Sequence, residues 1–182
     1  MGKAAFDETA NLPEGLVGLI GRSEVSLTIA DYTRPDCPLV AANQKFFDLC
    51  GYDEAEVIGK NCRFLQPEGG AGPVRKRMRE YLDDPRATDA KFVVPNVTKQ
   101  GEPFLNVIYM SKLTRNDRTE LILGSQFRMG NAMKEMAELY DRALSEDLRQ
   151  LNLLTNESNW VVLGSFEALA SSHSIIAQSK FE

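Results

Sequence analysis

Strand-like segments in this chain come in two contiguous blocks, separated by short helical segments. The first block has an apolar, β-branched run at 25–30 and a second run at 39–42, joined by the turn-rich sequence DYTRPDCP. The second block has three runs, at 87–97, 103–113 and 119–129. Strands that follow one another directly pair antiparallel, without helical crossovers. The sequence therefore predicts an α+β fold with a five-stranded antiparallel sheet.

Helical periodicity fills the gap between the two blocks. Residues 43–49 carry apolar side chains at helical spacing, and Asp53 with Glu56 has the pattern of a capping box at the start of a short helix. A further amphipathic stretch at 73–82 stops before Pro85. We expect these helices to pack on one face of the sheet.

The domain organisation follows from this order of elements. Residues 1–22 precede the first strand and are interpreted as an N-terminal cap, and residues 23–130 are predicted to form the main domain. Composition changes after that, and residues 131–182 are predicted to be a C-terminal helical extension.

The extension has two apolar stretches with helical spacing. From Met133 to Leu151, apolar residues recur every three or four positions, and a second stretch begins at Trp160. A helical hairpin is the expected structure. The apolar stripe fits a helix packed on its own domain as well as it fits a dimer interface, so both readings stay open.

Composition excludes several classes of function. A net charge of -5 argues against binding to nucleic acid or to anionic membranes, and no stretch approaches the ~20 apolar residues of a membrane span. Three cysteines and one histidine, His173, offer no metal-ligand spacing and no disulfide framework. We therefore expect a cytoplasmic protein without a metal site.

Cys62 is the residue with the most unusual surroundings. It lies in the octapeptide GKNCRFLQ at 59–66, between an amide, a guanidinium and a second amide. A reactive thiol and a half-buried structural cysteine fit this context equally well, because reactivity depends on exposure and on thiolate character.

The octapeptide resembles the signature of the LOV (light-oxygen-voltage) photosensors, a branch of the PAS superfamily. The resemblance extends over about 25–129 and includes LTIAD near the start and LILGSQF at the end. It implies a PAS/LOV fold and an FMN cofactor, with riboflavin and FAD less favoured. It also implies that blue light drives a reversible bond between the Cys62 sulfur and flavin C4a, while N5 gains a proton. The chain looks like a short bacterial LOV protein without a fused effector.

Carried over residue by residue, the resemblance implies a cofactor-binding set. Arg63 and Arg79 would bind the phosphate, which suits two permanently charged, planar donors, although Arg79 also fits a solvated helix charge. Asn61 and Gln66 would contact the ribityl chain and the ring. The other expected cofactor contacts are Thr28, Leu65, Phe104, Leu121, Leu123 and Gly124.

Three carboxamides on the later strands complete this set. Period-two alternation places Asn96, Asn106 and Gln126 on largely apolar faces, where buried amides need polar partners. The resemblance implies that both asparagines hold the edge of the flavin and that Gln126 faces N5. The alternative is that the asparagines are strand-edge or turn residues.

These expectations combine into a non-enzymatic blue-light photoreceptor. Gln126 would detect the change at N5 by rotating its amide, and the C-terminal helices would then alter homodimer packing or the binding of an unknown partner. A flavin-based redox sensor that uses the same pocket is the alternative. A DNA-binding tail is disfavoured, because residues 155–182 contain one lysine and no arginine.

Overall fold

The computed structural model describes residues 3–129, 133–156 and 160–163. Its strands are β1 (Ala4–Phe6), β2 (Ser26–Asp31), β3 (Leu39–Asn43), β4 (Asp89–Val97), β5 (Pro103–Arg115), β6 (Arg118–Arg128) and β7 (Trp160–Leu163). Its helices are α1 (Leu16–Arg22), α2 (Gln44–Cys50), α3 (Glu54–Val57), the 3-10 helix η1 (Cys62–Leu65), α4 (Val74–Asp83) and α5 (Met133–Asn156).

The strands form one antiparallel sheet in the order β1-β3-β2-β6-β5-β4. The five predicted strands are contiguous in this order, from β3 to β4, and the α+β prediction is confirmed. Two short strands extend the sheet. β1 pairs with β3, and β7 pairs with β5 over Lys112–Arg115, beyond Ser111, where the pairing of β4 with β5 ends.

The hairpin between β5 and β6 shows how local sequence sets which residues of neighbouring strands pair. Arg115 pairs with Arg118, and the two residues between them, Asn116 and Asp117, both have positive φ. Asn and Asp tolerate this conformation better than most residues, and a two-residue turn with both φ values positive matches the twist of antiparallel strands. The sequence RNDR therefore places β6 beside β5 in a defined phase.

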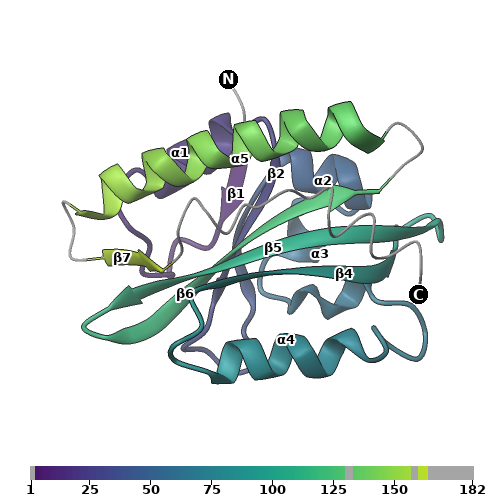
Figure 1. The fold of residues 1–182 in the computed structure, drawn as a ribbon, viewed down its shortest axis with the longest axis horizontal. Helices are drawn as coiled ribbons and strands as arrows, with labels where there is room; N and C mark the ends of the chain where they lie inside the picture. Colours follow the sequence, from purple (N-terminus) through teal and green to yellow (C-terminus); the bar gives the residue numbers. More distant parts are fainter. Residues whose placement is uncertain (1–2, 130–132, 157–159, 164–182) are drawn as a thin grey trace.

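Helices cover both faces of the sheet (Figure 1). α1 and α5 pack on one face, where Leu16, Ile20, Leu144 and Leu151 are fully buried in the largest core cluster. α2, α3, η1 and α4 cover the other face. The prediction of helices on one face holds for the segment between the two strand blocks, whereas the helices of the cap and of the extension occupy the second face.

Asn43 fastens the start of α2 to the sheet. It is buried, and its Oδ1 accepts hydrogen bonds from the backbone N–H groups of Leu27 (3.0 Å) and Phe46 (3.2 Å). Its Nδ2 donates to the carbonyls of Ile20 (2.9 Å) and Val25 (2.8 Å). One side chain thus joins α1, β2 and α2. Further on, the predicted capping box at the start of α3 is confirmed.

The prediction of a helix from Trp160 onward is wrong for 160–163, which form β7. Trp160 and Val162 are buried while Val161 is exposed, an alternation that a four-residue apolar run does not reveal without its partner strand. The predictions for 164–182, including His173, lie outside the described residues. No helix within the described part of the chain is long and apolar enough to cross a membrane.

Candidate functional site

A buried cavity lies between the sheet and the helices η1 and α4. Its walls come from β2, β3, β4, β5 and β6 together with the helical segment between the strand blocks. The lining residues are Thr28, Ala30, Leu39, Phe46, Cys62, Leu65, Gln66, Met78, Val94, Asn96, Asn106, Ile108, Met110, Ile122, Gly124 and Gln126. Most are apolar, and Cys62 is the single side chain among them that can ionise.

Cys62 is the first residue of η1, and Asn61 sets its position. The Asn61 Oδ1 accepts from the backbone N–H of Arg63 at 2.9 Å and thereby caps the 3-10 helix. The Asn61 Nδ2 donates to the carbonyl of Asp36 at 2.6 Å, which ties η1 to the loop between β2 and β3. The thiol is therefore presented from a turn that is held at both sides.

The surroundings of the Cys62 thiol keep its proton in place. Cys62 is exposed when the whole residue is considered. The protein atoms packed around its sulfur nevertheless raise the pKa of the thiol through desolvation, and this effect outweighs the opposing influence of the Arg63 guanidinium. The thiol is consequently protonated at neutral pH.

Gln126 is held by two hydroxyl groups at the sheet side of the cavity. The Ser26 hydroxyl donates to its Oε1 at 3.0 Å, and its Nε2 donates to the Thr28 hydroxyl at 3.0 Å. Gly124 leaves room for this arrangement, because a Cβ at that position would lie 2.8 Å from Thr28 Oγ1 and 3.1 Å from Gln126 Nε2. A larger residue would force this polar group out of place.

Asn106 supplies a polar atom that is not satisfied by the protein. Its Nδ2 donates to Asn96 Oδ1 at 2.9 Å, and Asn96 Nδ2 donates to the carbonyl of Pro95 at 2.9 Å. Asn106 Oδ1 is buried and has no hydrogen-bond partner. Buried carbonyl oxygens are rarely left in this state, so the cavity offers an acceptor to a ligand that carries a donor.

Comparison with known proteins gives the family. A family model described as a PAS domain matches residues 25–127, more than half of the chain. The solved LOV protein of Rhodobacter sphaeroides is 28% identical, superposes with a TM-score of 0.77, and covers 92% of this chain and 96% of its own. The chain belongs to the PAS domain family, in its LOV class.

Two curated relatives of this LOV chain are longer proteins, and the chain matches one part of each. Phototropin-2 of Oryza sativa subsp. japonica is 32% identical over 123 residues, which are 67% of this chain and 13% of the phototropin. Blue-light-activated histidine kinase 1 of Erythrobacter litoralis is 32% identical over 130 residues, which are 70% of this chain and 36% of the kinase. The LOV chain thus spans only a minor part of the length of each.

The structure gathers many of the expected cofactor contacts of this LOV domain around one cavity and leaves others outside it. Those at the cavity are Thr28, Cys62, Leu65, Gln66, Asn96, Asn106, Gly124 and Gln126. Those that do not line it are Asn61, Arg63, Arg79, Phe104, Leu121 and Leu123. The carboxamide of Asn61 is engaged in capping η1, as described above.

The two arginines lie on the outside of the LOV domain. Arg63 forms an ion pair with Asp36 at 2.5 Å, so an anionic ligand group would compete with that carboxylate. Arg79 is exposed on α4, and no hydrogen bond or ion pair engages its guanidinium within the described residues. Both remain candidates for a phosphate, and neither is part of the cavity wall.

Leu121 and Leu123 require a correction. Both are buried in the core beneath α1 and α5, on the face of β6 opposite to the cavity. The reason is strand alternation, since they are out of phase with Gly124 and Gln126 on the same strand. Phe104 is in phase with Asn106 but does not line the cavity either, and its ring centroid lies 5.2 Å from the Arg128 guanidinium carbon.

Several lining residues were not expected from the sequence. The period-two pattern of the expected strand residues contained enough information to find five more, which are Ala30, Val94, Ile108, Met110 and Ile122. The rest of the unexpected set, from β3 and the helices, is Leu39, Phe46 and Met78. Only the packing of these elements over the sheet brings them to the cavity.

The polar groups of this cavity suit a flavin, whereas the present volume of the cavity is too small to hold one. The pyrimidine edge of a flavin carries a ring N–H between two carbonyls, which matches the orphan Asn106 acceptor beside a second carboxamide. The enclosed volume is about 60 Å³, well below the ~300–1,000 Å³ of typical ligand pockets. Flexible lining side chains, such as Met78 and Gln66, would have to move outward when a ring enters.

Proposed function

We propose that this chain is a blue-light photoreceptor that binds FMN and forms a reversible bond between Cys62 and flavin C4a. LOV domains are flavin-binding modules, and the relatives of this chain include blue-light receptors. The observation that carries the proposal is the shared cavity. Three polar groups line the same largely apolar cavity. They are the Cys62 thiol, the hydrogen-bonded Gln126 amide and the unsatisfied Asn106 carbonyl oxygen.

The chain contributes a thiol with its proton. When bound, the flavin supplies an excited state under blue light and an electrophilic ring carbon that a sulfur atom can attack. Because the pKa of Cys62 is raised, the sulfur brings its own proton to the site, and that proton would pass to flavin N5 as the sulfur–carbon bond forms. No other ionisable side chain lines the described cavity.

Gln126 is suited to respond to a change of proton position at the ring. Its amide sits between two hydroxyls, and hydroxyls both donate and accept hydrogen bonds. After a half-turn of the amide, Ser26 can accept from Nε2 while Thr28 donates to Oε1. The amide itself keeps two bonds in both orientations, whereas Thr28 gives up its 3.3 Å bond to the Gly124 carbonyl in the second, and a donor or acceptor on the ligand decides between them.

We propose that α5 carries the output to a homodimer or to a downstream partner. Leu139 and Leu153 are 59% and 57% exposed on this helix. They are separated by nearly four full turns and so lie on a similar side of the helix. The chain itself acts as a sensor and not as an enzyme in this proposal, and it functions without membrane or nucleic acid.

Absorption spectroscopy tests the central step. The purified protein, reconstituted with FMN, should show the blue band of oxidised flavin, lose it under blue light and recover it in the dark. Cys62→Ala should retain the band and lose the bleaching. Cys37→Ala is the matched control and should behave like the parent protein, because Cys37 does not line the cavity. A protein that stays colourless with FMN contradicts the proposal.

Size-exclusion chromatography with light scattering, in the dark and under illumination, tests the output. The proposal expects a light-dependent change in oligomer size or in partner binding, which Gln126→Leu should weaken while bleaching persists. A bound flavin that bleaches in neither protein, but whose reduction changes the oligomer, would favour a redox sensor instead.

A further inference from the structure

Both chain neighbours of Gln126 contact a single tyrosine on α5. Side chains alternate along β6, so Ser125 and Phe127 point to the face opposite Gln126. The hydroxyls of Ser125 and Tyr140 are 2.7 Å apart, and the rings of Phe127 and Tyr140 have their centroids 5.0 Å apart. Ser125 is fully buried and Tyr140 nearly so. Tyr140 therefore spans the backbone segment that carries Gln126.

Further contacts hold α5 beyond Tyr140, whereas the turn of Tyr140 is joined to the sheet by Tyr140 and by an ion pair from Lys91 Nζ to Asp141 Oδ1 at 3.6 Å. Leu144, Leu148 and Leu151 are buried in the main core cluster. Two turns after Tyr140, the Ser23 hydroxyl donates to the Asp147 carboxylate at 2.6 Å. Movement of the whole helix would disrupt these contacts. A displacement limited to the helix segment around Tyr140 would leave them intact.

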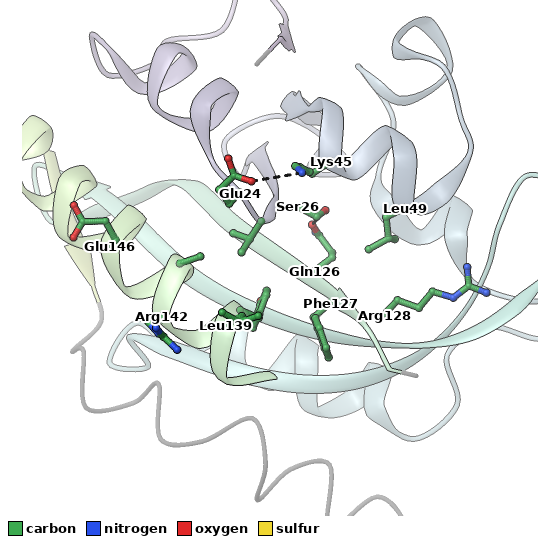
Figure 2. Close-up of a pocket in the computed structure, with 13 residues that line it drawn as sticks. Glu24, Ser26, Lys45, Leu49, Gln126, Phe127, Arg128, Leu139, Arg142 and Glu146 are labelled. Atoms are coloured by element: carbon green, nitrogen blue, oxygen red, sulfur yellow. Dashed lines mark hydrogen bonds and ion pairs between the residues drawn. The ribbon is translucent and has the colours of Figure 1, made fainter. Parts of the chain in front are cut away.

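Among the described residues, space for such a displacement lies beside Tyr140. A cleft of about 710 Å³ opens between α2, β6 and α5, and its lining includes Gln126, Ser26 and Tyr140. Figure 2 shows Leu139 and Glu146 on the α5 side of this cleft and Lys45 on the α2 side, with Gln126 between them. Tight packing resists small continuous shifts, whereas a helix turn beside open space can take a second position.

We propose that Tyr140 is the positioning residue through which α5 responds to Gln126, and that the Ser125–Tyr140 hydrogen bond is a releasable latch. The inference rests on the proposed function. Rotation of the Gln126 amide exchanges its bonds with Ser26 and Thr28 and shifts the β6 backbone at Ser125. Breaking this hydrogen bond leaves two buried hydroxyls without partners. The latch therefore has two states, one with the bond intact and one in which water from the cleft hydrogen-bonds to both hydroxyls.

Hydrogen–deuterium exchange of the full, FMN-loaded chain tests the latch, in the dark and under illumination. Tyr140→Phe removes the hydroxyl and keeps the ring against Phe127. Ser23→Ala is the matched control, because it also deletes a buried hydroxyl bonded to α5 but leaves both contacts of Tyr140 in place. Flavin bleaching is recorded for every sample, so that photochemistry and helix release are read separately.

In the parent protein, illumination should increase amide exchange at 139–145. Tyr140→Phe should bleach normally, with dark exchange of this segment about five-fold faster, as expected for the loss of one buried hydrogen bond, and with little further increase in light. Ser125→Ala should behave in the same way. Ser23→Ala should keep the light-dependent increase.

Two results overturn the latch while leaving the photoreceptor proposal standing. One is a parent protein that bleaches without any change in exchange at 139–145. The other is a Tyr140→Phe protein that keeps the full difference between light and dark. Absence of bleaching in the parent protein overturns the proposed function itself.

Discussion

Replacing Asn106 with leucine should separate flavin binding from folding. In the protein alone, the substitution removes the orphan Oδ1, whose burial costs about 1–3 kcal/mol. It also deletes the bond from Asn106 Nδ2 and leaves Asn96 Oδ1 without that donor, at a similar cost. One unsatisfied oxygen replaces another, and the free energy of unfolding should change by less than about 1 kcal/mol.

The effect on flavin binding should be much larger. Asn106→Leu removes the buried acceptor and leaves a ring donor of the ligand unpaired, which should cost about 1–3 kcal/mol, or roughly a 5- to 150-fold increase in Kd. FMN titration followed by fluorescence measures this change, and urea unfolding of the flavin-free protein measures stability.

Asn43→Leu is the matched control for this experiment. Asn43 is an equally buried asparagine, but both its amide atoms are satisfied by four backbone groups. Its replacement should lower the free energy of unfolding by more than about 3 kcal/mol, because several buried backbone groups lose their partner. The reasoning is refuted if Asn106→Leu destabilises the flavin-free protein as strongly as Asn43→Leu and binds FMN normally.

Three further perturbations follow from the structure. Gly124→Ala places a Cβ 2.8 Å from Thr28 Oγ1 and should destabilise the protein by about 1–2 kcal/mol in urea unfolding, with altered dark recovery of the flavin band. Desolvation raises the pKa of Asp147 above its ordinary value of 3.8, so its contribution to stability falls as pH rises through that raised pKa. Asp147→Asn should thus raise the melting temperature at neutral pH and not below pH 3.8. Lys112→Met removes an ammonium that caps α4 on three carbonyls, including that of Asp84 at 2.6 Å, and should cost about 2–3 kcal/mol by the same unfolding assay. An unchanged unfolding midpoint in the Gly124 or Lys112 variant, or a pH profile of the Asp147 variant parallel to the parent, would contradict the respective argument.

The cavity illustrates how far periodicity reaches. Alternation along β4, β5 and β6 is a local property, so it correctly grouped Asn96, Asn106 and Gln126 on one side of the sheet. The same rule, applied strictly, excludes Leu121 and Leu123, which the resemblance had suggested. Their assignment to the cavity was wrong because they alternate with Gly124 and Gln126 along the strand, and the sequence contained the information needed to see this.

The sequence by itself determined the two blocks of antiparallel strands, the turn within the first block, the cap of α3 and the family, because each depends on residues close together in the chain or on a contiguous motif. Tertiary structure decided the rest. The bond from Asn61 to the Asp36 carbonyl, the unsatisfied oxygen of Asn106, the pairing of β7 with β5 and the contact of Ser125 with Tyr140 all depend on which distant segments meet. Whether a buried polar group is satisfied depends on partners supplied by the whole packed fold, and no local pattern contains that information.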